Sequence, residues 1–253
     1  MKRVFAGAAA LALAAAGFAQ DPKQPKIKSP KEQEAVMAVF NAADSDTRIA
    51  AVENLLTKFV DTEFKAVALQ VAAMAAQEKN DFEKMVIYAE RTLEADPKNF
   101  HAMLMLASGF AQRTRETDLD KEEKLNRAEK FAKDAIEILK TAPKPRPDLD
   151  EAQWQGAKKD ITAQGYEALG MTAMVRKKYD DAITNFKTAI EGAATQDPAT
   201  RVRLASAYNQ TGKFDEALAA LEPVLADQNV NQVVRQFAGQ EKVKAAMGKA
   251  QKK

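Results

Sequence analysis

Cysteine is absent from this sequence of 253 residues, and histidine occurs once, as His101. Without cysteine the chain has no disulfide framework, iron–sulfur cluster, thiolate zinc site or cysteine nucleophile. A single histidine excludes any multi-histidine metal site. Glycine and proline, at 10 and 9 residues, are too few for a collagen-like or low-complexity chain. The common catalytic and metal-binding residue sets are therefore missing, and we expect no catalytic residue, no metal and no cofactor.

An excess of charge of one sign is also missing. The chain has 38 Lys and Arg against 36 Asp and Glu, and removal of Lys2 and Arg3 would leave equal numbers. A chain without net charge has no general attraction for the phosphate backbone, and no basic strip interleaved with aromatic residues is present. We therefore expect no nucleic-acid partner.

The N-terminus has the three regions of a secretory signal peptide. A basic start, Met1 to Arg3, precedes the apolar run 4–16. Small residues at Gly17 and Ala19 predict cleavage between Ala19 and Gln20. The apolar run is short for a membrane span, so an uncleaved anchor is the less favoured alternative. The sequence predicts export to the periplasm or the medium, with no membrane span after processing.

The rest of the chain has the pattern of an all-α protein. Residues 20–30 contain Pro22, Pro25 and Pro30 among polar neighbours, which is typical of a flexible linker. From Lys31 onward Ala, Leu, Glu, Lys and Gln dominate, and apolar residues recur at three- and four-residue spacing. No segment shows the sustained alternation of a β-strand.

A repeat of 34 to 35 residues runs through this helical region. Leu204–Tyr208 followed by Gly212–Ala217 matches Leu169–Ala173 followed by Lys177–Ala182, and an earlier pair of segments keeps the same period. Small residues recur where two helices of a hairpin would cross closely; they are Ala73, Ala107, Gly170 and Ala205, with Ala128, Ala182 and Ala217 on the facing helices. This pattern resembles the tetratricopeptide repeat family, whose unit is a helix–turn–helix of about 34 residues.

Together with the predicted signal peptide, the resemblance implies an exported bacterial protein built as an α-solenoid, a right-handed superhelix of stacked helical hairpins that ends in a polar capping helix. The expected parts are the signal peptide 1–19, the linker 20–30, units 31–62, 66–99, 100–141, 150–197 and 198–231, the capping helix 232–248 and a basic tail 249–253. The third unit carries an insertion around 114–124. A proline-rich segment, 141–150, precedes an extended helix that carries Trp154.

In the resembling family the first helix of each repeat lines a concave groove that binds polypeptides. Carried over to this chain, the groove candidates are Gln70, Met74, Gln77, His101, Leu104, Ser108, Glu167, Met171, Met174, Ser206 and Asn209. Amide, hydroxyl and thioether groups predominate in this set, and cationic side chains are missing from it. This composition predicts a partner protein or peptide that is neutral and partly apolar.

Three classes of function remain open at this point. The resemblance favours a non-enzymatic interaction scaffold or adaptor of the bacterial cell envelope. An alternative is a structural assembly protein of the envelope that self-associates, so homo-oligomerisation is possible. An enzyme with an unrecognised carboxylate pair is disfavoured, because the acidic residues are spread over the predicted helix surfaces.

Overall fold

The computed structural model describes residues 25–251, and within that range the chain forms helices joined by turns, without a strand. The helices are α2 (Pro30–Asn41), α3 (Ser45–Lys58), α4 (Lys65–Glu78), α5 (Phe82–Ala95), α6 (Phe100–Arg113), α7 (Lys121–Thr141), α8 (Glu151–Val175), α9 (Tyr179–Gly192), α10 (Pro198–Gln210), α11 (Phe214–Ala226) and α12 (Gln232–Gln251). The all-α prediction is therefore confirmed. The predicted signal peptide and its cleavage site at Ala19 and Gln20 lie outside the described residues.

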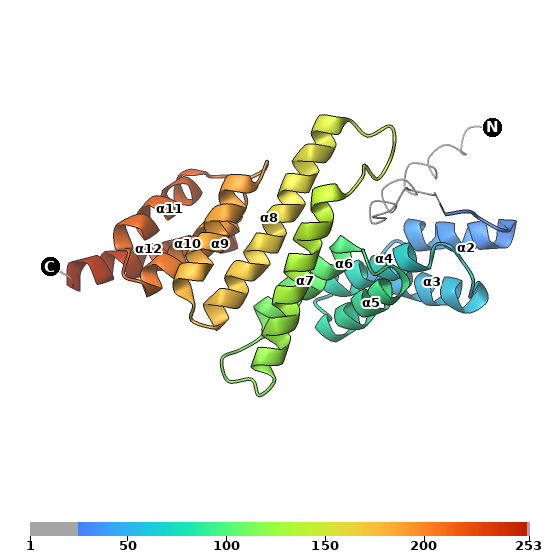
Figure 1. Ribbon diagram of the computed structural model, residues 1–253, viewed down its shortest axis with the longest axis horizontal. Coiled ribbons are helices and arrows are strands. Elements are labelled where there is room, and N and C mark those ends of the chain that lie inside the picture. Colours follow the sequence, from blue (N-terminus) through green and yellow to red (C-terminus); the bar gives the residue numbers. More distant parts are fainter. Residues whose placement is uncertain (1–24, 252–253) are drawn as a thin grey trace. The chain divides into compact units, whose positions relative to one another are not determined.

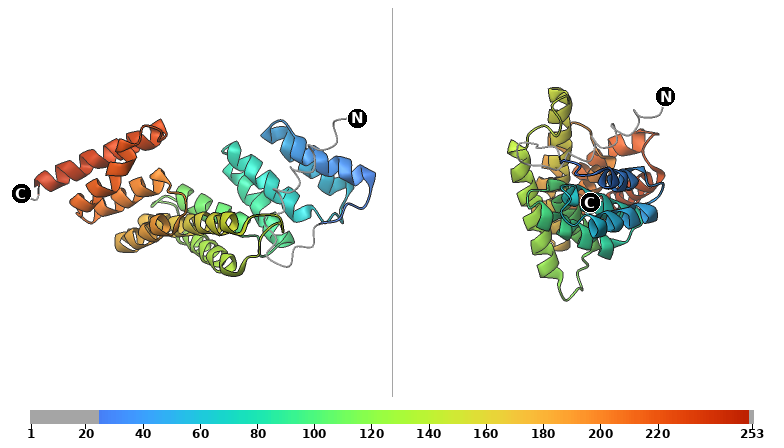
Figure 2. Two further views of the ribbon diagram at one scale, coloured as in Figure 1. Left: turned by 90° about the horizontal axis from the view of Figure 1, so that it is seen from above. Right: turned by 90° about the vertical axis from the view of Figure 1, so that its right-hand side faces the viewer.

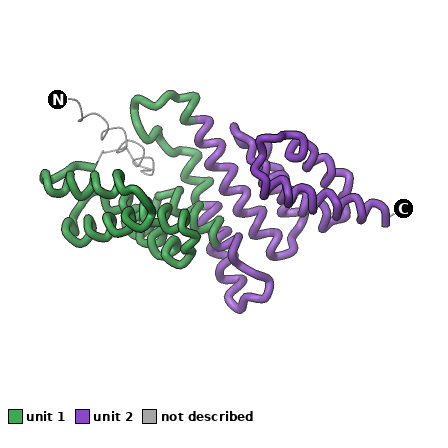
Figure 3. The backbone as a smooth tube through the Cα atoms, turned by 180° about the vertical axis from the view of Figure 1, so that it is seen from behind, with its two compact units in different colours: residues 1–109, 134–154 green, residues 110–133, 155–253 purple. Residues whose placement is uncertain are grey.

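The chain divides into two compact units (Figure 3). Unit 1 contains the described residues up to Gly109 together with Asp134–Trp154, and unit 2 contains Phe110–Lys133 together with the described residues from Gln155 onward. Helices α6, α7 and α8 each contribute to both units.

Unit 1 is built from helical hairpins in which each helix packs on the next. Helix α2 packs on α3, α3 on α4, and α4 on α5 (Figures 1 and 2). The small residues Ala73 and Ala107 are fully buried. Alanine at such positions lets helix backbones approach closely, and Leu55 and Leu69 are buried in the same unit.

Unit 2 continues the same scheme. Helix α10 packs on α9 and α11, and α12 packs on both α10 and α11. The repeat positions Ala128, Ala182, Ala205 and Ala217 are fully buried. At Gly170 in α8, an added Cβ atom would lie 2.5 Å from the ring of Phe186 in α9, so this crossing admits no side chain. Consecutive stacking of hairpins within each unit is the α-solenoid arrangement expected from the repeat.

The sequence explains where several helices begin and turn. Asp44 forms a capping box with Thr47 at the start of α3, and Asp81 caps α5 by accepting from the Lys84 amide. Asn80, Lys177 and Gly212 all have a positive φ, and each lies in the turn between the two helices of a hairpin. The repeat therefore extends to backbone conformation as well as to residue type.

Two expectations for the ends of the solenoid are corrected. The described part of the predicted linker is anchored, because the Lys26 amide donates to Glu63 and the Lys28 side chain forms an ion pair with Asp61. At the other end, α12 extends through Gln251 and includes most of the predicted basic tail, where Lys249 pairs with Asp215.

The insertion in the third unit consists of the connection between α6 and α7 and additional turns of α7, which is 21 residues long. Within unit 2, Arg176 at the end of α8 binds the start of α7: its guanidinium donates to Glu122, Asn126 and Glu129. No helix among residues 25–251 combines the length and apolar character that a membrane span requires.

Candidate functional site

Three of the predicted groove residues are buried in the core. Leu104 in unit 1 and Met171 in unit 2 are less than one-tenth exposed, and Gln70 is buried to the same degree. Little of their surface is left for a partner to contact. The groove prediction is therefore wrong at these three positions. They share a helix face with more accessible candidates three or four positions away, but packing inside the protein covers them.

Gln70 has a structural partner that explains its burial. Its Oε1 accepts a hydrogen bond of 3.0 Å from the side-chain amide of Asn99, which is itself buried. The Oδ1 of Asn99 in turn accepts from the Ala102 amide in the first turn of α6. The two amides thus connect α4 to the start of α6 through groups that are satisfied inside the protein.

The remaining candidates in unit 1 are at least partly accessible. Met74 and Gln77 are exposed on α4, whereas His101 and Ser108 on α6 are half-buried. The His101 ring lies 4.4 Å from the ring of Phe100, measured between centroids. These four residues stay a prediction of a binding face.

In unit 2, Asn209 is already engaged by the capping helix. Its side-chain amide donates to both the backbone carbonyl and the side chain of Glu241 in α12, at 3.0 and 2.9 Å. Asn209 therefore fixes α12 on α10. Glu167, Met174 and Ser206 are half-buried and keep part of their surface accessible.

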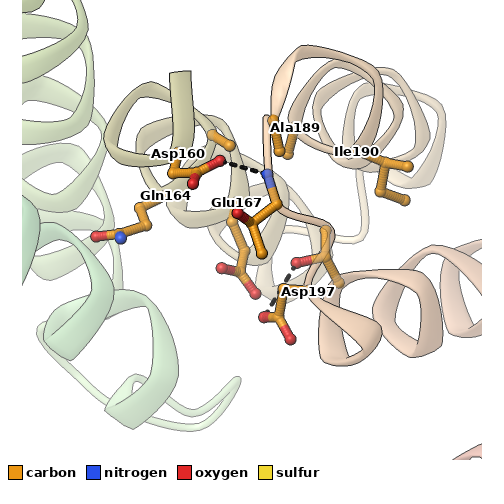
Figure 4. Close-up of a pocket in the computed structure, with 10 residues that line it drawn as sticks. Asp160, Gln164, Glu167, Ala189, Ile190 and Asp197 are labelled. Carbon is orange, nitrogen blue, oxygen red and sulfur yellow. Dashed lines mark hydrogen bonds between the residues drawn. The ribbon is translucent and has the colours of Figure 1, made fainter. Parts of the chain in front are cut away.

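A pocket in unit 2 includes one of the predicted residues, Glu167 (Figure 4). It has a volume of about 300 Å³ and lies between α8, the C-terminal end of α9 and the start of α10. Its polar lining comes from Asp160, Gln164, Glu167, Thr195, Asp197 and Thr200, and its apolar lining from Ala163, Ala189, Ile190 and Ala193. Three carboxylates and no basic side chain are among these lining residues.

The local structure holds each carboxylate in place. Asp160 accepts hydrogen bonds from the Ala194 and Thr195 amides, at 2.7 and 2.8 Å, and thereby anchors the turn after α9 to α8. Asp197 caps α10 by accepting from the Ala199 amide at 2.9 Å.

Glu167 is the most buried of the three carboxylates, and its charge is only partly compensated. Burial raises the pKa of Glu167 above its ordinary value, and the charge of Asp197 acts in the same direction. The guanidinium of Arg203 on α10 forms an ion pair with Glu167 and opposes this rise in pKa. The pocket therefore offers a negative potential next to apolar side chains, which suits a basic group with an aliphatic stem.

The sequence pattern did not reveal Asp160, Asp197 and Arg203 as parts of a site. Asp197 precedes Pro198, and this pair indicates the start of a helix. Nothing in the sequence indicates that the capping side chain also lines a pocket. Asp160 and Asp197 are 37 positions apart, and only the packing of α10 against α8 brings them to one cavity. Their separation is close to the length of one repeat, and this spacing is the signal that could have suggested their proximity.

Comparison with known proteins supports the repeat assignment. A family model described as tetratricopeptide repeat matches residues 173–248, which covers α9 to most of α12. This part of the chain is similar to tetratricopeptide repeats. No curated protein matches the sequence.

Two solved structures of tetratricopeptide repeat proteins match this chain over most of its length. A thermophilic protein of this class from Thermus thermophilus has a TM-score of 0.57 and 18% identity, over 84% of this chain and 99% of the other. A tetratricopeptide repeat protein from Parabacteroides merdae has a TM-score of 0.44 and 14% identity, over 87% and 91% of the two chains. The first similarity supports the α-solenoid fold.

Tetratricopeptide repeats are typically non-enzymatic scaffolds for protein–protein interaction. Among residues 25–251, no group of three or more acidic or histidine side chains has an arrangement suited to a metal ion. Each of the three carboxylates of the pocket has a hydrogen-bond partner within the protein.

Proposed function

We propose that this protein is a non-enzymatic scaffold that binds an extended, partly apolar segment of a partner protein on unit 2. The α8–α10 pocket, defined by the ten lining residues above, receives one basic side chain of that segment. The observation that carries this proposal is a pocket with three carboxylates, apolar walls and no basic lining residue. It revises the neutral partner expected from sequence, because Asp160 and Asp197 were not in the predicted set.

The geometry favours a lysine or arginine side chain over a purely apolar one. The methylene stem would contact Ala163, Ala189 and Ile190, while the charged end would reach the carboxylates. Negative charge in a partly desolvated pocket also attracts basic segments over some distance, so we expect binding to weaken as salt concentration rises.

A peptide array tests this proposal. The probes are decapeptides of alternating apolar and polar residues with lysine, arginine, glutamine or norleucine at the centre. We expect the lysine and arginine peptides to bind the protein, and Glu167→Gln to reduce their affinity about 10-fold, which corresponds to about 1.4 kcal/mol. Because burial raises the pKa of Glu167, the affinity should also fall on acidification as this carboxylate becomes protonated.

Glu191→Gln is the matched control, since this carboxylate is exposed at the end of α9 and does not line the pocket. It should leave the affinity within about 2-fold of the unsubstituted protein. Equal binding of lysine and norleucine peptides, or equal loss in the two variants, would contradict a role for the pocket.

Export to the cell envelope is the second part of the proposal. It rests on the order of basic, apolar and small residues at the N-terminus, which predicts cleavage after Ala19. We expect the natively expressed protein to have an intact mass that begins at Gln20, in the periplasmic or extracellular fraction. A mass that retains Met1 or Phe5 would show that the segment is an anchor or is not processed.

A further inference from the structure

The capping helix α12 occupies the place of the first helix of one more repeat, and within residues 25–251 no second helix follows it to complete the hairpin. Gly239 follows Ala205 by 34 residues, which is the repeat period. At Gly170 an added Cβ would meet the Phe186 ring of the second helix, but at Gly239 nothing lies within 4 Å of such an atom. The face of α12 around this position is uncovered.

The orientation of α12 is fixed by its opposite face. Ala238, Glu241 and Ala245 are buried against α10 and α11, and Glu241 receives the hydrogen bonds of Asn209. Farther along, Gly248 is close to the ring of Phe214 in α11. These contacts determine which side chains of α12 face the solvent.

The solvent side of α12 has an apolar stripe, which corrects the expected polar cap. The stripe consists of Val233, Phe237, Val243 and Met247, which are 58, 54, 57 and 59% exposed. With about 100° between successive residues, the four side chains cover about a third of the helix circumference. The other large apolar residues that are exposed among residues 25–251 are dispersed along the chain, as on an ordinary surface.

The stripe is symmetric about Gln240. Phe237 and Val243 are three positions from Gln240 on either side, and Val233 and Met247 are seven positions from it. In an antiparallel pair of α12 helices with its two-fold axis at Gln240, Phe237 lies opposite Val243 of the other copy, and Val233 opposite Met247. We propose that a second copy of this chain covers the stripe, so that the protein forms a two-fold dimer through α12.

Charges on α12 permit this pairing. Arg235, Lys242 and Lys249 lie about 120° or more from the centre of the stripe, on other sides of the helix. Lys244, seven positions after Phe237, is the one cation within the stripe, and it is paired with Glu241 of its own helix at 2.6 Å. Gly239 and Ala246 border the stripe on its other edge, and small residues there allow two helices to approach closely.

A single pair of helices gives a small interface, so we expect dissociation in the range of about 10–100 µM. Sedimentation equilibrium of the processed protein should show a monomer–dimer equilibrium across this range. Phe237→Glu should abolish the dimer while helicity is retained, since this side chain is half-exposed. Ile87→Glu, a substitution at a residue of α5 that is 52% exposed, should leave the dimer unchanged.

Cross-linking tests the axis itself, and the absence of cysteine makes single-cysteine variants unambiguous. Gln240→Cys places two thiols at the axis, so mild oxidation should produce a disulfide-linked dimer. Val233→Cys should remain monomeric, because the antiparallel arrangement places the two copies of this position about 21 Å apart along the helices. Ile87→Cys is the background control.

Failure would be visible in each measurement. A monomer at all concentrations, a dimer that survives Phe237→Glu, or Val233→Cys that cross-links as readily as Gln240→Cys would overturn the proposal. The monomeric result would point to a different protein as the occupant of the stripe. Peptide binding by the α8–α10 pocket involves none of these residues and is measured separately.

Discussion

Replacement of Gly170 by Leu in α8 should lower the free energy of unfolding by on the order of 3 kcal/mol. A Cβ atom at this position would already lie 2.5 Å from the Phe186 ring, and Phe186 is fully buried and cannot turn away without leaving a void. The remaining leucine atoms would force α8 and α9 apart. Denaturant unfolding followed by circular dichroism measures the loss.

The same substitution at Gly192 separates packing from helix propensity. Gly192 is the last residue of α9 and is exposed, with nothing within 4 Å of an added Cβ. Gly192→Leu should change stability by no more than about 0.5 kcal/mol. If the two variants were equally stable, the assignment of Gly170 as the crossing point between α8 and α9 would be wrong.

Asn99→Ala should destabilise the protein by about 2–4 kcal/mol through two losses at one position. The first is the hydrogen bond to the Ala102 amide, a helix cap that typically contributes about 1 kcal/mol. The second is the bond to Gln70, whose buried carbonyl would be left without its partner at a cost of about 1–3 kcal/mol. Denaturant unfolding again gives the free energy.

Two further variants separate the contribution of the helix cap from that of the Gln70–Asn99 hydrogen bond. Asn231 caps α12 by accepting from the Val233 amide, but it is exposed, so Asn231→Ala should cost only about 1 kcal/mol. Adding Gln70→Leu to Asn99→Ala removes the unpaired amide and should recover part of the stability. No recovery in the double variant would show that the Gln70–Asn99 bond does not stabilise unit 1.

Prediction from sequence succeeded where one local pattern repeats. The spacing of small residues at Ala73, Ala107, Gly170 and Ala205 indicated helical hairpins, and all four are buried where helices cross. It failed for part of the groove because residues on one helix face differ in how far their neighbours cover them. Gln70 and Met74 are four positions apart on one face of α4, yet Gln70 is buried against Asn99 whereas Met74 is 47% exposed.

The amino-acid sequence by itself determined the fold class, the repeat period and the positions where backbones approach closely, because helix formation and hairpin packing depend on residues within one period. Only the tertiary structure decided the binding features. The acidic pocket needs Asp160 of α8 and Asp197 beside α10, which meet through the stacking of separate hairpins. The stripe on α12 is exposed to solvent because Ala238 and Ala245, on another side of the helix, face the neighbouring helices. Which side of a helix is covered depends on the elements that pack against it.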